Sequence, residues 1–250
     1  MANPRCYAVR DLGEAQKACD SIGFPLVARA HFSVGGLGSG LAYNREDYQG
    51  LLEEAMRESL TGELLVEEAL EGWTKYVVVV LRDAWGGARV AGVLEQLSPL
   101  TYHEGDAVLV TPPCGTGGEA LYALREMALR VAETVSVTGA CEVKLAASPG
   151  WEEIYVVDVN PVAREALVLL ETLLGRDILQ AHLRILLGED IAAAAGDEEA
   201  WRATACQVAV PDRPGRRGGA GEGASCAGVV GPGSSGGEAP EARGPPEAGG

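Results

Sequence analysis

The stretch CEVKLAASPGWEEIYVVDVN (141–160) holds two strand-like segments around a Pro-Gly turn, and this pattern predicts a β-hairpin. Successive side chains of a strand point to opposite faces. Glu142 and Lys144 therefore share a face of the first strand, and Asp158 and Asn160 share a face of the second. If the hairpin closes at the Pro-Gly turn, these two polar pairs lie side by side.

Asp158 and Asn160 offer an acid and an amide one strand pitch apart. Hard oxygen ligands of this kind suit Mg²⁺ that is bound to phosphates. The alternative is an ordinary surface ion pair between Asp158 and Lys144 on a solvent-facing sheet. Spacing alone favours the surface pair.

Clear secondary-structure signals extend in both directions from this hairpin. Capping signals at Asp11 with Glu14, at Asn44, and at Thr116 with Glu119 predict helix starts. Strands are predicted at 25–30, 63–68, 75–83, 88–97, 106–112, 140–148 and 152–160, and helices at 11–23, 44–60, 116–135, 164–174 and 176–187. Antiparallel hairpins with helices between them indicate an α+β fold.

The segment HFSVGGLGSGLAYN (31–44) is rich in glycine and lies between a predicted strand and a predicted helix. It is either a loop that closes over phosphates or a plain hairpin turn. It matches neither the dinucleotide-binding fingerprint nor the P-loop, because it lacks GK[ST] and the βαβ context. Arg29 lies just before this loop and is well placed for a phosphate oxygen.

Two more segments are candidates for a nucleotide site. LLVEEALEGW (64–73) places two carboxylates before a connector, where adenine commonly bonds to the backbone. A solvated acidic loop is the more frequent alternative. His103 in TYHEGD can contact phosphate or act in acid–base chemistry, although a lone histidine in a turn is more often merely exposed.

Composition limits the class of partner. The 250 residues carry a formal net charge of −16, which disfavours nucleic acid and anionic membranes. No apolar run approaches the length of a membrane span and no signal peptide is evident, so we expect an intracellular protein, cytoplasmic or within an organelle. The six scattered cysteines indicate reduced thiols. The Gly-, Pro- and Ala-rich composition of residues 212–250 predicts a disordered tail.

Taken in order, five blocks resemble the ATP-grasp domain of the large chain of carbamoyl phosphate synthetase: GFPLVARAHFSVGGLGSGLAYN, LLVEEALEGWTKYVVVVLRD, YHEGDAVLVTP, CEVKLAA and VVDVNP. The resemblance implies an ATP-grasp fold, in which two α+β subdomains with antiparallel sheets grip ATP between them. We therefore expect an N-terminal extension at 1–6, a lid subdomain at 7–72, a core subdomain at 73–190, a helical or irregular linker at 191–211 and the disordered tail at 212–250.

The resemblance also implies a role for individual residues. Arg29 would contact phosphate, Gly35, Gly36, Gly38 and Gly40 would form the lid, Glu68 and Leu70 would bind adenine, His103 would lie near the ribose and phosphates, and Asp158 and Asn160 would hold Mg²⁺ or Mn²⁺. Arg29, His103 and Asn160 are the expected catalytic residues.

Three positions depart from the family pattern. Lys144 stands where the family has a glutamine metal ligand, Lys75 where it has a ribose-binding glutamate, and Val162 where it has a catalytic arginine. A protonated lysine cannot coordinate Mg²⁺, but its ammonium can occupy the place of the metal beside Asp158 or ATP phosphates. Loss of the arginine removes charge stabilisation of the transferring phosphoryl group. We therefore expect both lysines to contact the nucleotide.

Three hypotheses of function stay open at this point. The first is an ATP-dependent ligase that phosphorylates bicarbonate or carbamate through an acyl phosphate. The second is a degenerate ATP-grasp domain that binds nucleotide or a partner protein without turnover. The third is a truncated product with no independent role. A partner chain that supplies the family's preceding domain is a further expectation.

Overall fold

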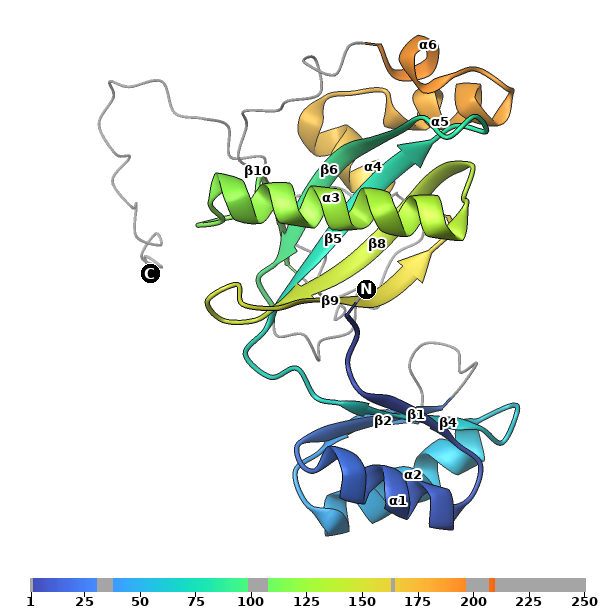
Figure 1. Ribbon diagram of the computed structural model, residues 1–250, viewed down its shortest axis with the longest axis vertical. Helices are drawn as coiled ribbons and strands as arrows, with labels where there is room; N and C mark the ends of the chain where they lie inside the picture. Colours follow the sequence, from blue (N-terminus) through green and yellow to red (C-terminus); the bar gives the residue numbers. More distant parts are fainter. Residues whose placement is uncertain (1, 31–37, 99–107, 163–164, 197–206, 210–250) are drawn as a thin grey trace, which may run out of the picture.

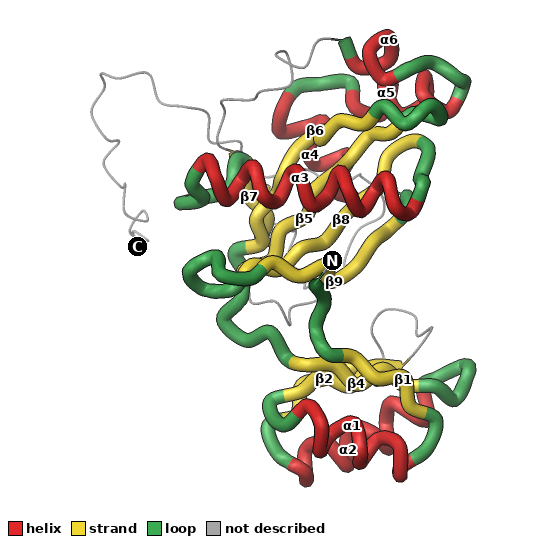
Figure 2. The backbone as a smooth tube through the Cα atoms, viewed as in Figure 1, coloured by secondary structure: helices red, strands yellow, loops and turns green. Residues whose placement is uncertain are grey.

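Two antiparallel sheets organise the chain (Figures 1 and 2). The computed structural model describes residues 2–30, 38–98, 108–162, 165–196 and 207–209. The predicted tail at 212–250 lies outside these described residues. Every strand pairing within the described residues is antiparallel, as the predicted α+β fold requires.

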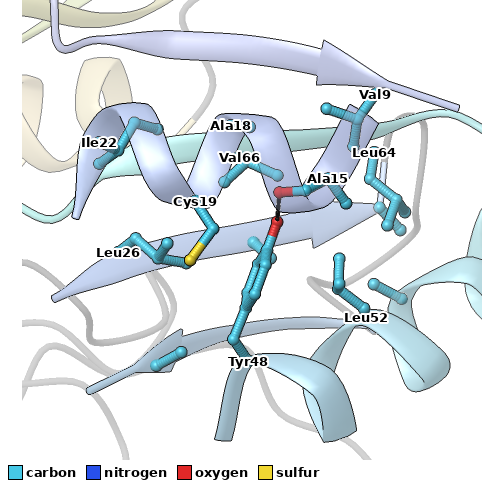
Figure 3. Packing of buried hydrophobic residues seen from close by; sticks show 14 residues of the cluster. Val9, Ala15, Ala18, Cys19, Ile22, Leu26, Tyr48, Leu52, Leu64 and Val66 are labelled. Atoms are coloured by element: carbon cyan, nitrogen blue, oxygen red, sulfur yellow. Dashed lines mark hydrogen bonds between the residues drawn. The ribbon is translucent and has the colours of Figure 1, made fainter. Parts of the chain in front are cut away.

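The first sheet has four strands, and its helices cover one face only. Its order is β1 (Cys6–Val9), β4 (Leu64–Glu68), β2 (Leu26–Ala30) and β3 (Ser39–Ala42). Helices α1 (Leu12–Ile22) and α2 (Arg45–Glu58) pack on the face that lies away from the second sheet (Figure 1). Figure 3 shows the apolar core between them, in which the Tyr48 hydroxyl donates to the Ala15 carbonyl at 2.8 Å.

The second sheet has six strands and helices on both faces. Its order is β10 (Gln207–Ala209), β7 (Leu109–Thr111), β6 (Ala88–Gln96), β5 (Thr74–Arg82), β8 (Gly139–Ala147) and β9 (Ile154–Asn160). One face packs against α3 (Gly118–Val135), and the other packs against α4 (Glu165–Leu174) and α5 (Ile178–Leu186). The short helix α6 (Ile191–Ala195) follows α5. The central strand β5 faces a core on each side, which explains its continuous run of valines.

Two of the three predicted helix caps are confirmed. Asp11 accepts a bond from the Glu14 backbone at 2.8 Å, and Asn44 caps α2 in the same way. The cap predicted at Thr116 is wrong, because α3 begins at Gly118 and has no side-chain cap. The Thr116 hydroxyl lies 3.3 Å from the Tyr76 hydroxyl instead, so its hydrogen bond goes to the sheet.

Two segments join the sheets beside one another. The chain passes from β4 to β5 through residues 69–73, and the N-terminal segment passes the same place before it enters β1 (Figure 2). The backbone N–H of Val156 in β9 donates to the Ala2 carbonyl at 3.1 Å. The rings of Trp73 and Tyr155 are in contact, with centroids 4.7 Å apart. These contacts hold the edge of the second sheet against the crossing between the two sheets.

Two expectations from composition can be compared with the described residues. No helix among them is both long and apolar enough to cross a membrane. Four of the six cysteines are described, and all four are free thiols, as predicted: Cys6, Cys19, Cys114 and Cys141.

Candidate functional site

Polar side chains gather on one face of the six-stranded sheet. Lys144 of β8 is paired with Val77 of β5 on one side and with Asp158 of β9 on the other. In the same register, Glu142 is paired with Asn160. Directly paired residues share a face, and Val77 belongs to the core beneath α4 and α5. The two polar pairs therefore lie side by side, as predicted, on the α4 and α5 face.

An ion pair forms the centre of this polar group. The Lys144 ammonium donates to Asp158 Oδ2 at 3.0 Å. The lysine side chain is only 5% exposed, whereas the aspartate side chain is 45% exposed. The ion pair between Lys144 and Asp158 is therefore present as the alternative predicted, but its position on the solvent-facing surface is wrong for the lysine. Burying an ammonium without a counter-charge is costly, and Asp158 supplies that counter-charge while it still reaches solvent.

A second lysine lies on the same face. Lys75 of β5 is 6% exposed and is paired with Gln96 of β6 and Ala146 of β8. Because Lys144 is two residues from Ala146, the two lysines are diagonal neighbours across β5 and β8. Diagonal neighbours lie about 7–8 Å apart in an antiparallel sheet. The fold therefore concentrates two buried cations on a single patch of the sheet.

Glu142 takes a structural role in this group. Its Oε1 accepts a hydrogen bond from the Ala166 backbone N–H at 3.3 Å, and the residue is buried. Ala166 lies in the first turn of α4, where the backbone N–H groups have no partner within the helix. A carboxylate at this position also interacts favourably with the positive end of the helix dipole. Glu142 thus fixes the start of α4 against the sheet.

Asp158, predicted to hold Mg²⁺ or Mn²⁺ together with Asn160, pairs with a lysine in this arrangement, and the metal role of both residues stays a prediction. Asp158 Oδ2 accepts from Lys144, and its Oδ1 accepts from the Val159 backbone at 2.9 Å. Within the described ranges, no three His, Cys, Asp or Glu side chains are grouped to hold a metal ion. A cation that approached Asp158 would also meet the Lys144 ammonium at close range.

Arg29 lies on the four-stranded sheet. Its neighbours Ala28 and Ala30 point into the core with α1 and α2, so Arg29 points to the opposite face, which is turned toward the six-stranded sheet (Figure 2). Its guanidinium pairs with Glu67 Oε1 at 2.7 Å. Sequence reasoning missed Glu67 as a partner, because 38 positions separate the two residues and only strand pairing joins them.

Two glycines of the predicted lid have a packing role in the structure. Gly38 adopts a φ of +69°, and a Cβ there would lie 2.9 Å from Cβ of Glu58 in α2. A Cβ on Gly40 would lie 2.8 Å from the Leu51 side chain in the same helix. The Gly38 contact and its positive φ require glycine there, whereas the Leu51 side chain that meets Gly40 can move aside. Their lid function stays a prediction.

The predicted adenine connector starts with a charged cluster that sequence reasoning did not foresee. Glu68 accepts from the Arg5 guanidinium at 3.1 Å, and this hydrogen bond lowers the pKa of the Glu68 carboxyl. Arg5 also donates to the carbonyls of Ser21 and Ile22 at the end of α1. Leu70 is buried. Arg5 belongs to the stretch expected to be a mere N-terminal extension, and no local sequence signal marks its role.

The structure thus sorts the predicted site residues into three groups. One face of the six-stranded sheet brings together Lys75, Lys144, Asp158 and Asn160. The four-stranded sheet and the connector carry Arg29, Gly38, Gly40, Glu68 and Leu70, each with its own local contacts. Outside the described residues lie Gly35, Gly36 and His103, and their roles stay predictions.

Comparisons with known proteins identify the family and the fold of the chain. A family model described as "Carbamoyl-phosphate synthase L chain, ATP binding domain" matches residues 2–194. The carbamoyl phosphate synthase large chain of Arthrobacter sp. (strain FB24) is 31% identical over 185 residues, which cover 74% of this chain and 17% of that protein. The mitochondrial arginine-specific large chain of Schizosaccharomyces pombe is 32% identical over 184 residues, which cover 74% of this chain and 16% of that protein. The chain therefore spans about a sixth of the length of these relatives.

Solved structures are similar in fold. Pyruvate carboxylase from Rhizobium etli superposes with a TM-score of 0.72 at 21% identity, over 84% of this chain and 19% of that chain. Biotin carboxylase from Campylobacter jejuni, in complex with β-γ-ATP, superposes with a TM-score of 0.71 at 17% identity. The match covers 83% of this chain and 47% of that chain. The biotin carboxylase domain of 2-oxoglutarate carboxylase from Hydrogenobacter thermophilus was solved with MgADP, ADP and bicarbonate. It superposes with a TM-score of 0.69 at 20% identity, and the match covers 83% of this chain and 46% of that chain. The fold is ATP-grasp, and the chain belongs to the family of carbamoyl-phosphate synthase L chain ATP-binding domains.

Proposed function

We propose that this domain binds ATP on the α4 and α5 face of the six-stranded sheet, without the phosphoryl transfer of a complete synthase. The observation that carries the proposal is the ion pair between the buried Lys144 ammonium and Asp158. The Lys144 ammonium of this pair would meet a triphosphate oxygen, while Asp158 holds that ammonium in position, in a chain whose net charge of −16 otherwise repels anions. Lys75 adds a second positive charge on the same face.

Two features support binding without turnover. The Asp158 carboxylate is engaged by Lys144 and by the Val159 backbone, so it is not arranged to hold a metal ion on the phosphates. Val162 is an exposed aliphatic residue at the position where the family resemblance implies a catalytic arginine. A missing charge of this kind typically costs orders of magnitude in the rate of phosphoryl transfer.

A second candidate function is phosphorylation of a carboxylate-type substrate, bicarbonate or carbamate. The chain keeps an acid and an amide at Asp158 and Asn160, and its relatives are named carbamoyl phosphate synthase large chains. In that reaction an oxygen of bicarbonate would attack the γ-phosphorus of ATP. The bond from that phosphorus to the β–γ bridging oxygen would break, so ADP would leave and an acyl phosphate would form.

The division into a lid subdomain at 7–72 and a core subdomain at 73–190 is part of the same proposal. Each of the two sheets has its own core, and the chain crosses between them after Glu68 and before Thr74. ATP would then lie between the sheets, with Arg29 facing it from the smaller one. The ion pair of Arg29 with Glu67 would have to open for the guanidinium to reach a phosphate.

One pair of measurements on the full chain separates these functions. Calorimetric titration with ATP should give saturable binding, whereas an ADP-release assay with bicarbonate should give no more product than the Asp158→Ala variant. Saturable binding together with ADP release that depends on both bicarbonate and Asp158 would instead establish the second candidate. Absence of binding in the titration would remove both.

A further inference from the structure

The lysines of this protein are unusually placed. The chain has three, and two of them, Lys75 and Lys144, are buried on the same face of the six-stranded sheet. The third, Lys17, lies exposed on α1 in the smaller lobe. Lysine is among the residues least often buried, because its ammonium loses hydration. Two buried lysines on adjacent strands are therefore a distinctive feature of this face.

The two ammonium groups of this face match the charge of a divalent cation, and the carboxylates of Asp158 and Glu142 lie beside them. Two ammonium groups about 7–8 Å apart at their backbones carry together the charge of one Mg²⁺. The metal-ligand position that the family resemblance assigns to residue 144 holds one of them, and the predicted ligand Asp158 pairs with it at 3.0 Å. A divalent cation placed beside Asp158 would be repelled by the Lys144 ammonium, which already pairs with that carboxylate.

We propose that Lys75 and Lys144 together replace the divalent cation, so that this domain takes a nucleoside triphosphate in its metal-free form. The inference rests on the proposed binding of ATP and adds the ionic form of the ligand. Asp158 holds the Lys144 ammonium in position, and its 45% exposed side chain leaves an approach from solvent. Metal-free ATP carries two more negative charges than its Mg²⁺ complex, and a site with two buried ammonium groups therefore favours it.

Calorimetry of the unmodified full chain provides the first test. Titration with ATP in excess EDTA should give a Kd equal to or lower than the Kd in excess Mg²⁺. Binding only when Mg²⁺ is present would overturn this inference and leave the proposed ATP binding intact. No binding in either condition would overturn both, so the two failures are distinguishable.

Three substitutions then assign the effect to the lysines. Lys144→Gln and Lys75→Gln should each weaken binding in EDTA by at least about tenfold, since each removes a buried charge that faces the phosphates. Their Kd in Mg²⁺ should change less, because the cation restores the missing charge. Lys17→Gln makes the same chemical change on the exposed face of α1 and should leave both constants unaltered.

The variant results can also contradict the inference. Equal weakening of Lys144→Gln in EDTA and in Mg²⁺ would show that the lysine does not substitute for a metal. Thermal unfolding followed by circular dichroism identifies any variant that has lost its fold, and the comparison of EDTA with Mg²⁺ on the unmodified chain decides the question without any variant.

Discussion

At the scale of single residues, Asp83, directly after β5, is a carboxylate outside the site that three backbone N–H groups hold in place. The residue is 2% exposed. Oδ1 accepts from the backbones of Trp85 and Gly87 at 2.9 and 2.8 Å, and Oδ2 accepts from the Ile191 backbone at 2.9 Å. Burial by itself would raise the pKa of Asp83, but these N–H donors outweigh it and lower the pKa. One side chain thus closes a hairpin and holds α6 to the sheet.

Asp83→Ala should lower the free energy of unfolding by about 2–4 kcal/mol, because three backbone N–H groups lose their acceptor. A group whose folded pKa is lowered stabilises the protein above its unfolded pKa, and this stabilisation is lost as the pH falls through the folded value. The difference between the two proteins in urea unfolding should therefore be constant near neutral pH and shrink below about pH 4. Asp177→Ala, at an exposed helix cap without a side-chain bond, is the control and should change stability little. Equal effects of the two substitutions would contradict the assignment.

At the scale of elements, the packing of α2 against the start of β3 explains why glycine stands at position 38. Gly38 combines a positive φ with contacts to the backbone of Ala55 and to the side chain of Glu58. A Cβ added to Gly38 would lie 3.0 Å from the Ala55 Cα and 2.9 Å from the Glu58 Cβ, which is closer than Cβ atoms ordinarily come to other atoms. A Cβ added to Gly50, in the middle of α2, would have no neighbour within 4 Å.

Substitution of these two glycines by alanine should have opposite effects. Gly38→Ala should destabilise the protein by about 1–3 kcal/mol, because it combines backbone strain with a clash against α2. Gly50→Ala should stabilise it by about 0.5–1 kcal/mol, because glycine is unfavourable inside a helix. Urea unfolding of both variants measures the difference. If Gly38→Ala were neutral for stability, the packing role would be refuted and the glycine would be available for the predicted lid.

At the scale of the whole molecule, the two sheets enclose separate apolar cores. Leu64 is fully buried between the four-stranded sheet and its helices, and Leu145 is fully buried between the six-stranded sheet and α3. A short connector and the N-terminal segment run between the two lobes (Figure 1). Regions with separate cores can open separately, and each opening exposes its own backbone amides to exchange.

Leu64→Ala and Leu145→Ala should therefore increase the hydrogen-exchange rates of backbone amides in different sheets. Each substitution should cost about 2–5 kcal/mol within its own core. Hydrogen exchange followed by mass spectrometry should show faster exchange of β2 in Leu64→Ala and faster exchange of β5 in Leu145→Ala, with little effect on the other sheet. Each variant serves as the control for the other. Equal acceleration in both sheets by either substitution would mean that the lobes unfold as one unit and would contradict the proposed subdomains.

The sequence by itself determined the α+β class, the hairpin of β8 and β9, and the shared face of Glu142, Lys144, Asp158 and Asn160, since alternation and turn residues are local signals. It missed β1, β3, α6 and β10, which have three to five residues each and depend on pairing or packing with distant segments. Only the tertiary structure decided which partners the charged groups have. Arg5 meets Glu68 and Arg29 meets Glu67 across 63 and 38 positions, and Lys144 is buried although its spacing suggested a surface pair. Periodicity along a chain fixes the face on which a side chain lies, but burial and ion pairing depend on what the rest of the chain places over that face.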